Sequence, residues 1–139
     1  MNLSLSPLAL EVLDLIDTLV ARYQESYEAA AARHQLTGSQ VRVLELLSHQ
    51  PLAMRRLAER LKCEPSNVTG IVDRLEARGL VRRQPDPADR RVKLAAVTEA
   101  GRLIGDQVRA STDFTRTRLT TLPPEDCAAL HAGLCRMLN

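Results

Sequence analysis

Two stretches of the chain carry side chains suited to contact with a nucleic acid, and the first is residues 65–78. Its polar helical face combines short hydrogen-bonding side chains, a glycine and a long cation: Ser66, Asn67, Thr69, Gly70 and Arg74. Asparagine pairs with adenine and arginine with guanine in the major groove of duplex DNA. The N-terminal end of a recognition helix reaches the base edges, and its free amides favour phosphate. We therefore predict that these residues contact duplex DNA, with Ser66 serving the helix start and a nearby phosphate.

The second stretch is the charged loop 85–91, which ends in Arg90 and Arg91. It joins two predicted strands, residues 80–84 and 92–97, and its two prolines cannot lie within a central strand. A narrow minor groove attracts arginine strongly. The loop is therefore predicted to be the tip of a β-hairpin that presents cations to the minor groove.

Two predicted short helices, residues 53–61 and 65–78, must position the polar face. Ala58 is the small residue needed where the helices cross. The second helix has an inward apolar stripe made of Val68, Ile71, Val72 and Leu75. A helix-turn-helix followed by two strands is a winged helix, so both stretches point to one ligand, duplex DNA.

A simpler interpretation of the same helix stays open at this stage. Ser66 would only cap the helix, Gly70 would have no special role, and Arg74 would pair with Asp73 or Glu76. A winged helix used only for contact with another protein is a further alternative.

Charge is concentrated where these elements lie. Residues 53–93 hold nine Arg and two Lys against six acids, a balance of +5, whereas residues 1–52 carry −3 and residues 94–139 are neutral. Such a distribution is typical of a phosphate-binding surface on an otherwise neutral protein, although a solvated basic face would look the same. Aromatic residues make up only 2%, so the stacking platform of single-strand binders is missing.

Helix starts are marked along the rest of the chain. Ser6 can cap the first helix, Thr37 and Gln40 form a capping box, Thr98 can cap another helix, and prolines open the last one at Pro124. The predicted helices outside the helix-turn-helix are residues 7–34, 38–50, 98–122 and 124–138.

The terminal helices are more apolar than one small winged helix needs, and two-fold pairing would bury their stripes. The predicted fold is thus mainly α with a small β-wing. Residues 1–35 and 99–139 form a helical dimerisation region, and residues 36–98 form the winged helix-turn-helix region, within one intertwined domain of a homodimer.

An ordered series of short motifs covers residues 8–138. The motifs are Leu36-Thr37 with Gln40 and Leu44, residues 57–61, residues 66–69, residues 75–81, residues 86–91, and then Leu94, Thr98 and Gly101. In this series the sequence resembles the MarR family of bacterial transcriptional regulators. Lys62 departs from the pattern, because related helix-turn-helix proteins often carry glycine in that turn.

The resemblance implies a winged-helix dimer whose N- and C-terminal helices interleave between subunits. Family members bind pseudo-palindromic operators, mostly as repressors, and many release DNA when a small aromatic or phenolic compound binds. Asp89 and Arg91 match the family's D-x-R wing motif. Arg91 is therefore expected in the minor groove, held by Asp89, and Arg90 is expected on a phosphate.

Two further groups of residues could sense a signal. Tyr23 and Tyr27 on the first helix are candidate effector-binding residues, with burial in a dimer core as the alternative. Cys127, His131 and Cys135 recur every four residues on the last helix, so a thiol or metal sensor has a physical basis. Packing is the alternative for these cysteines, since free cysteine is among the most buried residue types.

The sequence lacks the motifs that enzymes, membrane-spanning proteins and disulfide-bonded proteins require. The glycines form neither a phosphate loop nor a dinucleotide fingerprint, and the pair Cys127–His131 has no oxyanion hole beside it. No apolar run approaches the roughly 20 residues of a membrane span, and three cysteines without an export signal argue against disulfides. We therefore expect a cytoplasmic, dimeric regulator without cofactor or metal. It would be a ligand-responsive repressor and not an enzyme.

Overall fold

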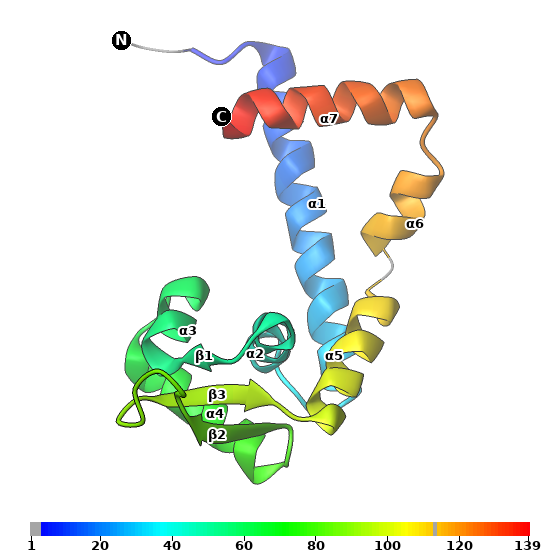
Figure 1. Ribbon diagram of the computed structural model, residues 1–139. Helices are drawn as coiled ribbons and strands as arrows, with labels where there is room; N and C mark the ends of the chain where they lie inside the picture. The colour runs from blue at the N-terminus through cyan, green and yellow to red at the C-terminus, as the bar shows by residue number, and fades with distance from the viewer. Residues whose placement is uncertain (1–3, 113) are drawn as a thin grey trace. The chain divides into compact units, whose positions relative to one another are not determined.

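The computed structural model describes residues 4–112 and 114–139, and the chain divides into two compact units. One unit is Tyr27–Ser111, and the other joins Met1–Ser26 to Thr112–Asn139. Most residues are helical and one small antiparallel sheet is present, which confirms the predicted fold class (Figure 1). Residues 1–3 and 113 belong to the predicted dimerisation region but lie outside the described residues.

The unit Tyr27–Ser111 begins with the end of helix α1 (Pro7–Ala32). Its other elements are α2 (Gly38–His49), β1 (Leu52–Ala53), α3 (Met54–Leu61), α4 (Pro65–Ala77), β2 (Val81–Pro85), β3 (Lys93–Val97) and α5 (Glu99–Ser111). The sheet order is β1-β3-β2, so the wing strand β2 lies at an edge (Figure 1). In its register Val81 faces Val97 and Pro85 faces Lys93. Pro85 is tolerated at the end of an edge strand.

The core of this unit lies where α2, α3 and α4 meet the sheet and α5. Fully buried side chains come from each of these elements: Val41, Leu44, Leu47, Leu57, Val68, Val72, Leu75, Val81 and Val108. Three of the four predicted inward residues of α4 are buried, and Ile71 packs against the core from a half-buried position. The apolar period of the sequence therefore orients α4 with its polar face away from the core.

Local hydrogen bonds fix the predicted helix starts and ends. The Thr37 side chain accepts from the Gln40 amide, and the Gln40 side chain accepts from the Thr37 amide, which confirms the capping box. The Ser6 hydroxyl accepts from the Ala9 amide at 3.2 Å. After α4, Gly79 takes φ +71°, a left-handed conformation that suits glycine.

The prediction of one long helix over residues 98–122 is wrong. Instead, α5 ends at Ser111 and α6 runs over Phe114–Thr120. The Ser111 hydroxyl donates to the Gln107 carbonyl, and such side-chain bonds compete with the helical ladder. Thr98 does cap α5, because its hydroxyl accepts from the Gly101 amide at 3.2 Å. The short strand β1 was not anticipated.

The second unit consists of α1 up to Ser26, α6 and α7 (Pro124–Leu138). It exposes many large apolar side chains, with Leu8 and Leu15 each 69% and Leu138 85% exposed. None of the buried hydrophobic residues found among the described residues lies in this unit. Within the same described residues, no helix is both long and apolar enough to cross a membrane.

Candidate nucleic-acid interface

The turn between α3 and α4 is tight and adopts left-handed geometry at Lys62. This residue has φ 52° and ψ 46°, a conformation that costs an L-residue energy and that glycine adopts freely. The Cys63 amide donates to the Ala58 carbonyl at 3.2 Å and closes the turn. The departure at Lys62 therefore leaves the turn geometry intact and places the strain in this one residue.

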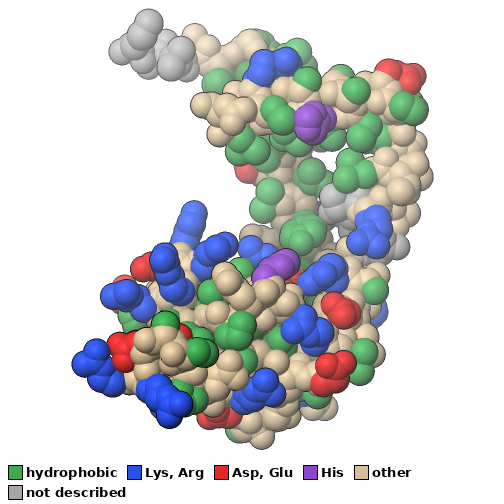
Figure 2. Space-filling view, in the orientation of Figure 1, with side chains coloured by type: hydrophobic (Ala, Val, Ile, Leu, Met, Phe, Trp, Pro, Cys, Tyr) green, Lys and Arg blue, Asp and Glu red, His purple; other side chains and the backbone are tan. Residues whose placement is uncertain are grey.

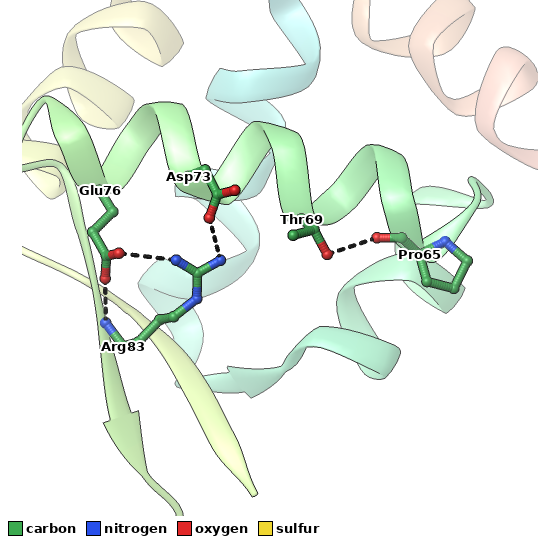
Figure 3. Close-up of polar contacts among 5 residues, drawn as sticks. All are labelled: Pro65, Thr69, Asp73, Glu76 and Arg83. Carbon is green, nitrogen blue, oxygen red and sulfur yellow. Dashed lines mark hydrogen bonds and ion pairs between the residues drawn. The ribbon is translucent and has the colours of Figure 1, made fainter.

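Helix α4 begins two residues earlier than a capping role of Ser66 requires. Glu64 is the N-cap without a side-chain hydrogen bond, and Pro65 opens the helix. Ser66 is therefore inside the first turn, where its side chain is exposed, and it does not cap the helix. The Thr69 hydroxyl donates to the Pro65 carbonyl at 3.1 Å, so only its acceptor lone pairs face outward (Figure 3).

The outer face of α4 matches the predicted polar face. Ser66, Asn67 and Arg74 are exposed, and a Cβ added at Gly70 would meet no atom within 4 Å. Arg74 has no hydrogen bond or ion pair with any described residue. Its pairing with Asp73 or Glu76, the simpler interpretation, is wrong because Arg83 takes both carboxylates.

Arg83 on β2 joins the wing to α4 (Figure 3). One guanidinium nitrogen lies 2.7 Å from Asp73 Oδ1 and the other lies 2.9 Å from Glu76 Oε1. The Arg83 amide also donates to Glu76 Oε2 at 3.1 Å. The hydrogen bond to Asp73 raises the pKa of the Arg83 guanidinium, against the opposing effect of burial, and Glu76 adds to the rise. No local pattern in the sequence indicates this cluster, because the partners are seven and ten residues apart.

At the hairpin tip, Asp89 holds Arg91. The Arg91 amide and Nε each donate to Asp89 Oδ1 at 3.1 Å, and Nη2 donates to Oδ2 at 3.2 Å. The Arg91 side chain remains 91% exposed, and Arg90 is exposed beside it. The hydrogen bonds from the Arg91 side chain and backbone lower the pKa of the Asp89 carboxyl. The tip thus presents a guanidinium that is held in place but open to a ligand.

A pocket of about 820 Å³ lies between the end of α1, the start of α2, the end of α3 and α4. Its lining includes Tyr27 and three arginines, Arg42, Arg60 and Arg74. Asn67 and Gly70 of the predicted reading face border the same space. Arg42 and Arg60 were not predicted as site residues. Tyr23 does not line this pocket and belongs to the other unit.

Basic side chains gather on the face of the molecule shown in Figure 2, over α3 and around the hairpin loop. Another arginine, Arg78 at the end of α4, has a structural role. It donates to the carbonyls of His34 and Gln35 at 2.9 and 3.0 Å and so ties α4 to the loop before α2. Sequence spacing could not have indicated this contact, since the partners are more than forty residues apart.

The thiols are distributed over both units. Cys127 and Cys135 are exposed on α7, and Cys135 Sγ lies 3.6 Å from His131 Nε2. Cys63 is half-buried. In the part of the chain that the structure describes, no three His, Cys, Asp or Glu side chains gather to hold a metal ion. The redox role of Cys127 and Cys135 stays a prediction.

The helix pair α3–α4 followed by the β2–β3 hairpin defines a winged helix-turn-helix protein. Residues 34–92 match the MarR family. The chain belongs to this family, whose members are transcriptional regulators and not enzymes.

The similarity extends to individual proteins. Over 86 residues, 61% of this chain and 54% of the relative, the sequence is 35% identical to the HTH-type transcriptional repressor NicR of Pseudomonas putida. The structure of CouR from Rhodococcus jostii, bound to p-coumaroyl-CoA, is 32% identical, covers 86% of each chain and gives a TM-score of 0.70. The YusO protein of Bacillus subtilis is 28% identical with a TM-score of 0.74, over 96% of this chain and 98% of that one. The matched region spans about half to three fifths of the first curated relatives.

Proposed function

We propose that this chain is a sequence-specific regulator that binds double-stranded DNA as a dimer and represses transcription until an effector binds. The observation that carries the proposal is the pairing of a free polar face on α4 with an exposed, Asp89-held Arg91 on the wing. A major-groove helix and a minor-groove arginine are the two contacts that winged-helix DNA binding requires.

Each site residue has a distinct role in this proposal. Asn67 and Arg74 read base edges, and Thr69 accepts a hydrogen bond through its free lone pairs. Gly70 lets the helix backbone approach the groove, since it adds no side chain on that face. On the phosphate backbone we expect Ser66 and Arg90, while Arg91 enters the minor groove.

Selection from a library of random 30-base-pair duplexes tests the proposal. We expect enrichment of an inverted repeat, bound with an affinity that falls steeply as salt rises, because bound Lys and Arg release counterions. Arg74→Ala should then weaken binding by about 1–3 kcal/mol and relax preference at one position of each half-site. A purified protein that enriches no sequence and binds random duplex without salt dependence would exclude DNA recognition.

We propose that the unit containing α6 and α7 forms the dimer interface. Its helices expose leucines such as Leu8, Leu15 and Leu138, and burying one such side chain yields about 1.5–3 kcal/mol. In a two-fold dimer each of these leucines is buried once in each subunit. The dimer also presents two recognition helices, as an inverted repeat requires. A monomeric mass in sedimentation at micromolar concentration would contradict it.

The effector is proposed to be a small aromatic or phenolic compound bound in the pocket beside Tyr27. This pocket combines apolar walls from Tyr27, Leu61 and Ile71 with arginines, and it borders the reading face of α4. The similar protein CouR was solved with p-coumaroyl-CoA, an ester of a phenolic acid. Titration with p-coumarate and with p-coumaroyl-CoA tests the idea through release of the selected duplex. Tyr27→Ala should reduce sensitivity to the active compound, and Tyr23→Ala serves as the comparison because Tyr23 lies outside the pocket.

A further inference from the structure

The base of the wing and the recognition helix are linked by Arg83. Its guanidinium bridges Asp73 and Glu76, and its amide donates to the second Glu76 oxygen, so the cluster joins β2 to α4 at three points (Figure 3). Arg83 is only 26% exposed, whereas the two carboxylates are 59% and 42% exposed. Pairs this exposed add little to stability, but two carboxylates bound to one planar group restrict its orientation.

In the part of the chain that the structure describes, the wing tip has no such link to α4. Among the described residues, the hydrogen bonds and ion pairs of the loop 86–91 stay within residues 86–92. Arg91 is therefore held relative to Asp89 by the tip, and its position relative to α4 is transmitted through the strands. β2 is the edge strand that contacts α4 through Arg83.

Asp73 adds an electrostatic reason for the bridge. It is exposed on α4, where a free carboxylate would repel the phosphates that Arg74 and Ser66 approach. The single positive charge on Arg83 offsets half of the negative charge of the two carboxylates and holds both toward β2.

We infer that Arg83 is a positioning residue for DNA recognition: it fixes the angle between wing and recognition helix at which Arg91 and α4 enter neighbouring grooves together. The inference rests on the proposed function. It differs from direct phosphate contact by Arg83, which would contribute independently of Arg91, and from a purely structural role, which would change folding alone.

A double-mutant cycle between Arg83 and Arg91 separates these possibilities. Residues without contact normally contribute additively, within about twofold in affinity. We expect Arg83→Met to weaken binding to the selected duplex about tenfold, comparable with the loss of one specific contact. In that background Arg91→Ala should reduce the affinity less than about threefold, although it reduces the affinity much more in the wild type. The reason is that a wing without the Arg83 bridge no longer places Arg91 in the minor groove, so removing Arg91 removes little binding energy.

Two further variants make the test specific. The pair Asp73→Asn with Glu76→Gln keeps Arg83 but breaks the bridge. In this background, too, Arg91→Ala should cost less than about threefold in affinity, even though the pair makes the surface more positive. Arg82→Met is the matched control, because it removes a neighbouring cation whose guanidinium, among the residues that the structure describes, bonds only to Gln84 within β2. Arg82→Met should leave the cost of Arg91→Ala unchanged.

Hydroxyl-radical footprinting provides an independent readout, since the Arg83→Met complex should lose the minor-groove protection made by the wing. Additive losses in both cycles, or an unchanged wing footprint, would overturn the role of Arg83 and leave DNA binding intact. Failure of the wild-type protein to bind any selected duplex would instead overturn the proposed function, and the inference with it. Thermal unfolding of each variant shows whether any loss comes from misfolding.

Discussion

The two units of the chain differ in where their apolar side chains lie. In Tyr27–Ser111 most leucines and all valines of α2, α3 and α4 are buried within the unit itself. In the unit built from both ends of the chain, leucines at the same helical spacing are 38–85% exposed. The same pattern thus produces a closed core in one region and an open apolar surface in the other. An apolar stripe alone does not say whether the covering surface comes from the same chain.

Truncating a core leucine should have the largest effect on stability and would sharpen this comparison. Leu44→Ala removes a side chain that is 1% exposed, and such substitutions cost about 2–5 kcal/mol. Leu103→Ala, in the same unit but 58% exposed, is the matched control and should cost less than about 0.5 kcal/mol. Urea denaturation measures both, and equal losses would contradict the distinction between the two environments.

Charging the exposed stripe should break the second unit's association while leaving the first unit folded. Leu15→Glu places a carboxylate on a residue that is 69% exposed in the single chain. In a two-fold dimer the change occurs twice, so we expect dimer affinity to fall by about 3 kcal/mol or more, roughly a hundredfold. Sedimentation velocity measures dissociation, and circular dichroism checks that helix content persists. A dimer of unchanged affinity would show that this stripe is not the interface.

Removing the wing guanidinium should affect DNA binding without affecting the fold. Arg91→Ala deletes a side chain that is 91% exposed, and we expect a loss of about 1–3 kcal/mol on the selected duplex. Arg90→Ala should weaken specific and random duplexes alike, because a phosphate contact carries no base preference. Anisotropy titrations on both duplexes distinguish the two arginines.

Relieving the strained turn should stabilise the first unit slightly. Lys62→Gly places glycine at φ 52°, where an L-residue pays roughly 1 kcal/mol. We expect a gain of up to about 1 kcal/mol in the free energy of unfolding, reduced by the greater entropy of glycine in the unfolded chain. Lys62→Ala removes the same charge without the conformational freedom and should give no gain. A loss of stability in Lys62→Gly would argue against left-handed geometry at this position.

The smallest effect expected is a pH dependence at the wing tip. Contact with Arg91 lowers the pKa of Asp89, so the contact is fully formed at pH values above the ordinary pKa of a carboxyl group. It is lost as the pH falls through the lowered pKa, because Asp89 is then protonated. At constant salt concentration, the affinity for DNA should therefore fall as the pH is lowered into the acid range. Asp89→Asn should lack this extra dependence, since it has no group to titrate there.

Sequence patterns predicted the local features of the site well. The capping box at Thr37, the glycine stop at Gly79 and the inward face of α4 depend on residues within one or two turns of each other, and the structure contains all three. The Asp89–Arg91 contact spans two residues and was likewise expected from the wing motif. Two expectations are wrong. The simpler interpretation made Ser66 the cap of α4, but Glu64 is the N-cap, and the helix after Thr98 ends at Ser111 and not near residue 122.

The amino-acid sequence alone determined the helices, the hairpin and the polar face of α4, because capping, helical periodicity and the restrictions of proline act over a few neighbouring residues. Tertiary structure decided that Asp73 and Glu76 bind Arg83 and leave Arg74 without a hydrogen bond or ion pair to any described residue. It also decided that Arg78 holds the loop before α2 and that Tyr27 borders a pocket with α4. Those relations depend on which distant elements pack together, and packing geometry is a property of the folded core that no short stretch of sequence specifies.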